Sequence, residues 1–189
     1  MRAFIAIELS AGVKDSISRI QEKLKTEPLK INWVKPQNLH LTLKFLGDIS
    51  PEQLSRIKQI ISGITKTPGF RIKLNTLGVF PDMAAARIIW IGDNQPTLEL
   101  KQLAEQLEIK LEISGIARQP KPFSAHITIG RIKSRLLLSD LQKVIDKIKR
   151  DMEGTNWEFD CSKVTLFEST LGPGGPAYTM LDQFNLKIN

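Results

Sequence analysis

Apolar side chains recur with two different periods along this chain of 189 residues. Residues 2–9 form an apolar, β-branched run that is typical of a buried strand, and Ser10 is placed to cap a helix directly after it. The period then changes, because the apolar side chains that follow fall on one helical face. This face consists of Val13, Ile17, Ile20 and Leu24. The pattern therefore predicts a strand followed by an amphipathic helix.

The next segments continue this alternation of strands and helices. Residues 31–34 predict a short strand, and a turn leads from it into a longer strand at residues 38–47. A second helix begins after Ser50, because Pro51 suits the first helical position and Gln53 completes a capping box. Its buried stripe consists of Leu54, Ile57, Ile61 and Ile64.

The second part of the chain repeats the order of elements in the first. A strand at residues 70–79 closes the first part, after which residues 88–91 predict a strand and residues 96–112 a helix. When the two earlier helical stripes are shifted by 87 positions, every position but Asp151 remains apolar. The shifted stripes are Leu100, Ala104, Leu107 and Leu111 in one helix, and Leu141, Val144 and Ile148 in the other.

We infer a diverged internal duplication from this repetition. The chain is then a single bilobal domain over residues 1–189, with pseudo-repeats at about 1–82 and 83–189. Residues 157–167 correspond to the strand at the end of the first repeat and predict a strand of their own. The final strand, at residues 177–187, either completes the second repeat or crosses to the first.

Composition and charge narrow the class of partner. The fractions of hydrophobic (41%) and charged (25%) residues are those of an ordinary soluble globular protein. A net charge of +7 favours an anionic partner such as RNA, because neutralised phosphates release counterions.

The lone Cys161 cannot form an internal disulfide, which suits a reducing compartment, and we interpret it as a buried strand thiol. The apolar run at residues 4–7 is too short for a signal peptide or a membrane span, so we expect a cytoplasmic location.

The only two histidines lie in near-copies of one short motif. His40 precedes Thr42 by two positions, and His126 precedes Thr128 in the same way, 86 positions further along. Because side chains alternate along a strand, each histidine shares a face with its threonine, and the apolar residues between them take the other face. If the two repeats face each other, both histidine–threonine pairs point into one cleft.

Two imidazoles in one cleft suit acid–base chemistry at phosphorus. With an ordinary pKa of about 6.5, one can act as general base and the other as general acid. Two hydroxyl groups beside them can donate hydrogen bonds to the non-bridging oxygens of a phosphodiester. No acidic cluster accompanies the histidines, so we expect neither a metal nor another cofactor. A single such histidine would more simply be a satisfied strand residue, but two matched copies favour the catalytic interpretation.

Two cations close to the motifs are candidate substrate contacts. Lys44 has the parity of His40 and could reach phosphate, or it is a solvated charge at the end of the strand. Arg131 has the wrong parity for the cleft unless the strand twists or bulges at that point.

The paired motif resembles the signature of the 2H phosphoesterases. The runs from Trp33 to Gly47 and from Phe123 to Arg131 more narrowly resemble the RNA 2′,3′-cyclic phosphodiesterases, also called 2′-5′ RNA ligases, and the likeness extends over essentially the whole chain. Two positions depart from the family pattern: Ala125 stands where proline is frequent, and Lys121 where arginine is common.

This resemblance implies both a fold and an activity. The fold is α+β, a bilobal internal duplication with two antiparallel sheets lining a central cleft and helices packed outside. The activity is metal-independent hydrolysis of an RNA 2′,3′-cyclic phosphate end to a 2′-phosphomonoester. The resemblance makes His40 the proton donor and His126 the proton acceptor, with Thr42 and Thr128 on the phosphate. The near-symmetry of the two motifs allows the donor and acceptor roles to be exchanged.

Two other functions remain open at this point. The same acid and base could join tRNA halves through a 2′-5′ bond, with a 5′ hydroxyl group in place of water. The chain could instead be a non-catalytic RNA-binding module. It contains no P-loop glycine pattern, so ATP-driven ligation is not supported. No dimerisation stripe is evident, and we expect a monomer.

Overall fold

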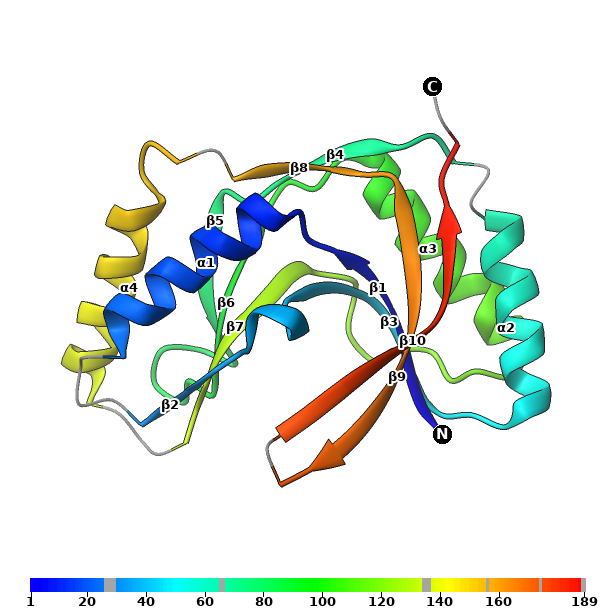
Figure 1. Ribbon diagram of the computed structural model, residues 1–189, viewed down its shortest axis with the longest axis horizontal. Helices are drawn as coiled ribbons and strands as arrows, with labels where there is room; N and C mark the ends of the chain where they lie inside the picture. The colour runs from blue at the N-terminus through cyan, green and yellow to red at the C-terminus, as the bar shows by residue number, and fades with distance from the viewer. Residues whose placement is uncertain (26–29, 65–66, 134–136, 156, 174, 188–189) are drawn as a thin grey trace.

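The computed structural model describes most of the chain. The described residues are 1–25, 30–64, 67–133, 137–155, 157–173 and 175–187. Within them the chain forms four α-helices and three antiparallel sheets, so the expected α+β class is confirmed (Figure 1). No helix in this part of the chain is long and apolar enough to cross a membrane.

The first sheet has four antiparallel strands in the order β10-β9-β1-β3. They are β1 (Arg2–Glu8), β3 (His40–Asp48), β9 (Lys163–Gly172) and β10 (Gly175–Asn185). The first two come from the start of the chain and the last two from its end. The final strand pairs with β9 of the second repeat, and β9 in turn pairs with β1 of the first, so the structure combines the two arrangements that the sequence left open.

The second sheet has the order β2-β7-β6-β5 and also mixes the two halves of the chain. Its strands are β2 (Ile31–Trp33), β5 (Thr76–Phe80), β6 (Ile88–Asp93) and β7 (Ala125–Ile132). A smaller sheet pairs β4 (Phe70–Lys73) with β8 (Glu158–Cys161). Each half of the chain thus supplies strands to both large sheets, and neither sheet corresponds to one sequence repeat.

Two of the expected strands are broken where the chain passes from one sheet to another. The segment expected as one strand at residues 70–79 is interrupted at Leu74 and Asn75, whose backbone N–H groups donate to Trp157 and Gly92 respectively. The segment at residues 157–167 is likewise divided between β8 and β9. Alternating side chains cannot reveal such a change of partner, because both parts are extended.

Two of the four α-helices, the first and the second, begin where the capping residues predict. The four helices are α1 (Ala11–Leu24), α2 (Pro51–Ile64), α3 (Leu98–Ile113) and α4 (Leu138–Met152), with a short 3-10 turn η1 (Pro36–Asn38). Ser10 Oγ accepts a hydrogen bond from the Val13 N–H at the start of α1. Ser50 and Gln53 form the expected capping box, with distances of 2.9 and 3.2 Å.

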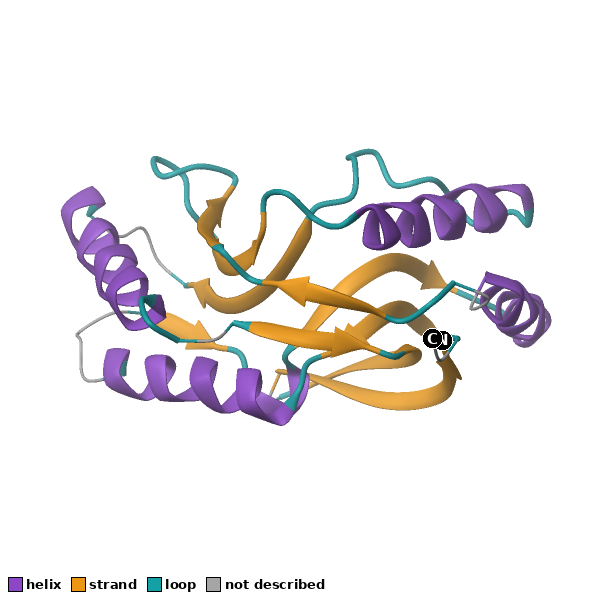
Figure 2. Cartoon of the chain, turned by 90° about the horizontal axis from the view of Figure 1, so that it is seen from above, coloured by secondary structure: helices purple, strands orange, loops and turns teal. Residues whose placement is uncertain are grey.

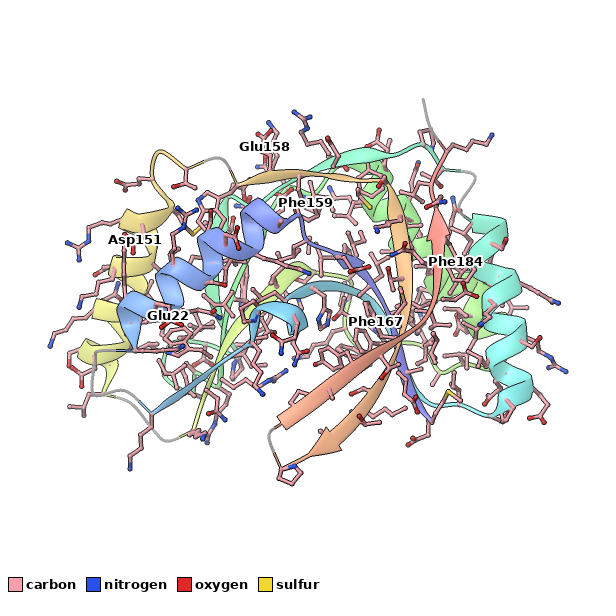
Figure 3. The ribbon with its side chains drawn as sticks, in the orientation of Figure 1. Glu22, Asp151, Glu158, Phe159, Phe167 and Phe184 are labelled. Carbon is pink, nitrogen blue, oxygen red and sulfur yellow. The ribbon has the colours of Figure 1, made fainter. Side chains whose placement is uncertain are left out.

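The helices lie outside the sheets in two pairs. Helix α2 packs on α3, which contacts β3, whereas α1 packs on α4, which contacts β5 (Figures 1 and 2). Asp151, the one polar residue in the shifted stripes, lies on α4 (Figure 3) and pairs with Lys23 of α1 at 2.8 Å. The pairing explains why a carboxylate is tolerated at that position.

Each large sheet buries one face in the hydrophobic core. The first sheet contributes Ile5, Ile7, Leu41 and Leu43, and the second contributes Ile89, Ile91, Ile127 and Ile129. Cys161 is also buried, and burial raises the pKa of its thiol to about 12. The interpretation of Cys161 as a buried strand thiol is therefore confirmed. We call the face of each large sheet that lies opposite its core residues the open face of that sheet.

Candidate active site

The two histidines are held by the same backbone device. His40 is the first residue of β3, and its Nδ1 lies 2.7 Å from the carbonyl oxygen of Asn38. His126 lies near the start of β7, with its Nδ1 2.9 Å from the carbonyl oxygen of Ser124. Because a carbonyl can only accept, Nδ1 of each ring is the donor, and Nε2 carries the lone pair of the neutral imidazole. Both rings are thus prepared to exchange a proton through Nε2.

The histidine strands lie close together although they belong to different sheets. Strand β3 packs against β7 without pairing with it. The two imidazoles are near enough for the charge of His126 to contribute to the lowered pKa of His40. The structure therefore brings together the two motifs that are far apart in sequence.

Both strands also contain a bulge at the same distance from the histidine. In the pairing of β1 with β3, Ala6 lies opposite Thr42 but Ile5 lies opposite Lys44, so Leu43 has no partner. In the pairing of β6 with β7, Ile129 is left out in the same way, between Thr128 and Gly130. Each bulge reverses the faces of the residues that follow it.

This reversal corrects the expectation for Lys44. Lys44 is 0% exposed, and its Nζ lies 2.8 Å from Glu108 Oε1 and 2.8 Å from the carbonyl oxygen of Ala117. It therefore points into the helix side of the sheet and is neither a substrate contact nor a solvated charge. Strict alternation gave the wrong face because it did not include the bulge.

The second bulge has the opposite consequence for Arg131, which it turns toward the open face. Arg131 is exposed, and its positive charge adds to the burial that lowers the pKa of His40 and opposes the burial that raises the pKa of Tyr178. This is the exception under which the sequence allowed Arg131 to face the site. On β3 the equivalent position is Phe45, whose ring lies 6.2 Å from that of Phe4 on the open face.

Aromatic side chains surround His40. The centroid of the Phe4 ring lies 4.8 Å from that of the imidazole. The centroid of the Tyr178 ring lies 5.2 Å from it, in an edge-on orientation. Burial lowers the pKa of His40 to about 4, opposed by the hydrogen bond to Asn38 and assisted by the charge of Arg131. His40 is therefore neutral at pH 7 in the ligand-free protein.

His126 has an aromatic surround of its own. The ring of Phe80 lies 5.0 Å away and that of Trp90 6.1 Å away, both edge-on. Trp90 covers Gly78 so closely that a Cβ there would lie 2.3 Å from the indole. Burial also lowers the pKa of His126, against the effect of its hydrogen bond to Ser124.

The sequence did not single out these aromatic neighbours. They could have been found only from their positions in the sheets. Phe4 lies on β1 and Trp90 on β6, the strands that pair with the two histidine strands, and both lie on the same face as the histidines. Those positions depend on the strand register, which no local pattern supplies.

Asn38 connects His40 to the hairpin formed by β9 and β10. Its backbone carbonyl accepts from His40, while its side-chain Nδ2 donates to the carbonyl oxygen of Pro176 at 2.8 Å. Tyr178 follows two residues later on β10 and covers the imidazole. The end of the chain thereby completes the surroundings of His40.

A carboxylate also lies on this face beside His40. Glu8 is opposite His40 in the pairing of β1 with β3. Its Oε1 accepts hydrogen bonds from Thr165 Oγ1 and Gln183 Nε2, each at 2.9 Å. Because Nδ1 of His40 is already oriented by a backbone carbonyl, Glu8 does not orient the ring as the aspartate of a Ser-His-Asp triad does.

Thr42 and Thr128 lie on the open faces next to their histidines. Both are half-buried, opposite Ala6 and Trp90 respectively. Among the described residues neither hydroxyl group has a hydrogen-bond partner, so both can donate to a ligand.

Two further features bear on where the chemistry lies. Within the described part of the chain, no group of three or more His, Cys, Asp or Glu side chains could hold a metal ion. A hollow of about 530 Å³ lies between β4, β8 and α4, lined by Trp157 and Met152 among others. It contains neither histidine, and its Lys73 and Glu158 already form an ion pair. We therefore place the site at the histidines.

The family comparison covers most of the chain. The LigT-like phosphoesterase family matches it twice, at residues 7–90 and 91–178. Each match contains one of the two histidine–threonine pairs. The duplication that we infer from the sequence stays an inference, with a boundary near residue 90 in this comparison instead of 82.

Relatives and solved structures agree with this family match. The chain is 36% identical over 191 residues to the RNA 2′,3′-cyclic phosphodiesterase of Aquifex aeolicus, covering 98% of this chain and 97% of the relative. It is 33% identical over 187 residues to the protein of that name from Methanothermobacter thermautotrophicus, covering 98% and 99%. The crystal structure of Escherichia coli LigT complexed with 3′-AMP superposes with a TM-score of 0.80 at 30% identity, covering 98% and 97%.

Proposed function

This chain belongs to the LigT-like phosphoesterase family, and on that premise we propose that it hydrolyses the 2′,3′-cyclic phosphate end of RNA to a 2′-phosphomonoester. One observation carries the proposal: two imidazoles near each other, each with Nδ1 bound to a backbone carbonyl and Nε2 left for proton transfer. The names of the relatives support the cyclic phosphate as the substrate.

The reaction needs one base and one acid on opposite sides of the phosphorus. His126 Nε2 accepts a proton from water as the water oxygen forms a bond to phosphorus. The bond from phosphorus to the 3′ oxygen breaks, and His40 Nε2 donates its proton to that oxygen. The product has gained one water molecule in all, and the two histidines have exchanged protonation states.

The negative charge on the phosphate is met by groups from both strands. Thr42 and Thr128 donate their hydroxyl protons to the non-bridging oxygens, where charge is concentrated in the transition state. Arg131 supplies a positive charge on the same side as His40. All of these groups belong to the protein, which supports a reaction without metal or cofactor.

The acid must gain its proton when substrate binds. Because burial lowers the pKa of both histidines, the ligand-free protein holds both rings neutral at pH 7. An anionic phosphodiester between them favours the protonated form of one ring and offsets the charge of Arg131. The family resemblance makes His40 the proton donor. Burial argues the other way: His40 is the more deeply buried of the two rings, so His126 should take up a proton more readily. The assignment of the two roles therefore stays a prediction.

Other parts of the expectation from sequence also stay predictions. They are the use of tRNA fragments as substrates, the joining of tRNA halves, the monomeric state and the cytoplasmic location. The alternative of a non-catalytic RNA-binding module predicts salt-dependent RNA binding without turnover.

The experiment is hydrolysis of a short RNA that ends in a 2′,3′-cyclic phosphate, with and without a chelator. We expect His40→Ala and His126→Ala each to lower kcat by about 10²- to 10⁴-fold, the usual contribution of a general acid or base. The chelator should have no effect. Undiminished hydrolysis by either variant would contradict the mechanism, and loss of activity on chelation would contradict metal independence.

A further inference from the structure

A row of apolar side chains crosses the open face of the first sheet. Cα pairing places Met180 opposite Phe167, Phe167 opposite Phe4, and Phe4 opposite Phe45, so the four side chains share one face. We call these four residues the apolar row. Phe167 is labelled on β9 in Figure 3, beside β1 and β10. The two ends of the row are open to solvent, with Phe45 and Met180 each 57% exposed.

The row leads directly to the catalytic imidazole. Phe4 is only 3% exposed, because its ring contacts Phe45 at 6.2 Å, Phe167 at 5.3 Å and His40 at 4.8 Å. Phe45 therefore presents its free side one ring away from His40. The nucleotide that precedes the one carrying the reacting phosphate would be within reach of it.

The bulge in β3 is what exposes Phe45. Without the bulge, alternation would place Lys44 on the open face and Phe45 among the core residues. Instead Lys44 occupies the core position, where Glu108 and Ala117 satisfy its ammonium group. The bulge therefore leaves an aromatic ring open to solvent beside the site, at a position where simple alternation would have buried it.

Positive charges lie beside the row. Arg2 and Arg131 are both exposed. Burial raises the pKa of Tyr178 and the charge of each arginine opposes that rise, so both cations lie near Tyr178, whose ring centroid is 4.9 Å from that of Phe4. Tyr178 also covers His40. An exposed aromatic ring with cations near it is the kind of surface that binds single-stranded RNA, through base stacking and phosphate contacts.

The second sheet offers no comparable surface. Phe80 and Trp90 stack on each other at 5.1 Å, and the indole already covers Gly78. Arg131 takes the position on β7 that Phe45 takes on β3. The two open faces therefore differ in what they can bind.

We propose that the apolar row binds the nucleotides that precede the cyclic phosphate, with a base stacked on Phe45 and the RNA backbone near Arg2. This inference rests on the proposed function and deepens it, because it names the surface that binds the RNA strand on the 5′ side of the reacting nucleotide. It also puts the ribose that carries the leaving oxygen on the His40 side of the phosphate. That placement is the one that the donor role of His40 requires.

The test compares two substrates in parallel: a 2′,3′-cyclic mononucleotide and a four-nucleotide RNA with the same terminal base and a cyclic phosphate end. We expect Phe45→Ala to lower kcat/KM about tenfold for the RNA, which corresponds to the loss of one stacked base. We expect a change of less than about twofold for the mononucleotide, which has no base to place there. Phe45→Trp should retain the activity on RNA, because an indole stacks at least as well.

Ile113→Ala is the matched control, since Ile113 is an apolar residue 81% exposed at the end of α3. It should change neither rate. A second arm uses an RNA with an abasic site before the terminal nucleotide, on which unmodified protein and Phe45→Ala should be equal.

The outcomes separate the inference from the function on which it rests. Equal effects of Phe45→Ala on both substrates, or no effect on either, would overturn the inference while hydrolysis itself remains. If light scattering shows that Phe45→Ala breaks a dimer without altering the preference for RNA, the row belongs to a contact between copies of the chain and the inference is wrong. Failure of the unmodified protein to hydrolyse either substrate would instead contradict the proposed function.

Discussion

Strands β3 and β7 are built on one plan but end in different chemistry. Each has, at or next to its first residue, a histidine whose Nδ1 donates to the carbonyl two residues earlier, followed by a threonine on the same face. Both contain a bulge directly after the threonine. Up to the bulge the two strands are equivalent, and this equivalence is what makes a symmetric acid–base pair possible.

Beyond the bulge the two strands diverge. On the core side, β3 has Lys44, which pairs with Glu108, whereas β7 has Gly130, where a Cβ would lie 2.9 Å from Ile31. On the open side, β3 has the aromatic Phe45 and β7 has the cationic Arg131. The comparison indicates that the matched part performs the chemistry, and that the divergent part gives the two sides of the substrate different surroundings.

The largest effect that we expect on stability concerns the divergent core side. Lys44→Met leaves the carboxylate of Glu108 with only the Gln119 N–H as a partner among the described residues; because Glu108 is 17% exposed, we expect a loss at the low end for a broken buried pair, about 3 kcal/mol. Urea unfolding measures this loss. The double variant Lys44→Met with Glu108→Leu should recover part of it, because it removes the unpaired charge but leaves the Gln119 N–H without its acceptor. A single variant as stable as the unmodified protein would show that the pair contributes nothing.

The histidines themselves should differ in their effect on the pH dependence of stability. The pKa of His40 is lowered to about 4 in the folded protein from about 6.5 in the unfolded chain, so the unfolded chain binds the extra proton first. The free energy of unfolding should therefore fall as the pH decreases from about 6.5 to 4, by about 3 kcal/mol from this residue.

His40→Asn should flatten this slope, measured by urea unfolding at a series of pH values. His126→Asn provides the comparison: its pKa is lowered too, but it is less deeply placed among aromatic rings, so its variant should flatten the slope less. A larger flattening of the slope in His126→Asn than in His40→Asn would contradict the inference that His40 is the more deeply buried histidine.

The threonines should have equal and smaller effects, this time on catalysis. Thr42→Val and Thr128→Val preserve shape but remove the hydroxyl donor, which costs about 100-fold in kcat for a typical transition-state donor. Steady-state kinetics on a cyclic-phosphate RNA measures this, with thermal unfolding as a check on folding. A loss in only one of the two variants would show that the phosphate is not held symmetrically.

The sequence was informative where structure is determined locally. The caps at Ser10 and Ser50 predicted the starts of two helices, and strand alternation placed the histidines and threonines on the face opposite the core. These features depend on residues within a few positions of each other, which is why they are readable without a structure.

The sequence was uninformative where structure depends on distant partners. The bulge at Leu43 arises in the pairing of β3 with β1, so no local pattern could place Lys44 in the core or Phe45 outside it. The same is true of the division of residues 70–79 between two sheets, and of Tyr178, which reaches His40 from the end of the chain.

The most direct test of the central claim is whether the two histidines have opposite roles in one reaction. The measurement uses an RNA cyclic phosphate in which sulfur replaces the 3′ bridging oxygen, because a thiolate leaves without needing a proton. We expect this substrate to restore hydrolysis by His40→Ala to within about tenfold of the unmodified protein, and not to restore His126→Ala. Restoration of His126→Ala alone would exchange the two roles. Equal behaviour of the two variants, with both restored or neither, would contradict the claim that β3 and β7 supply an acid and a base.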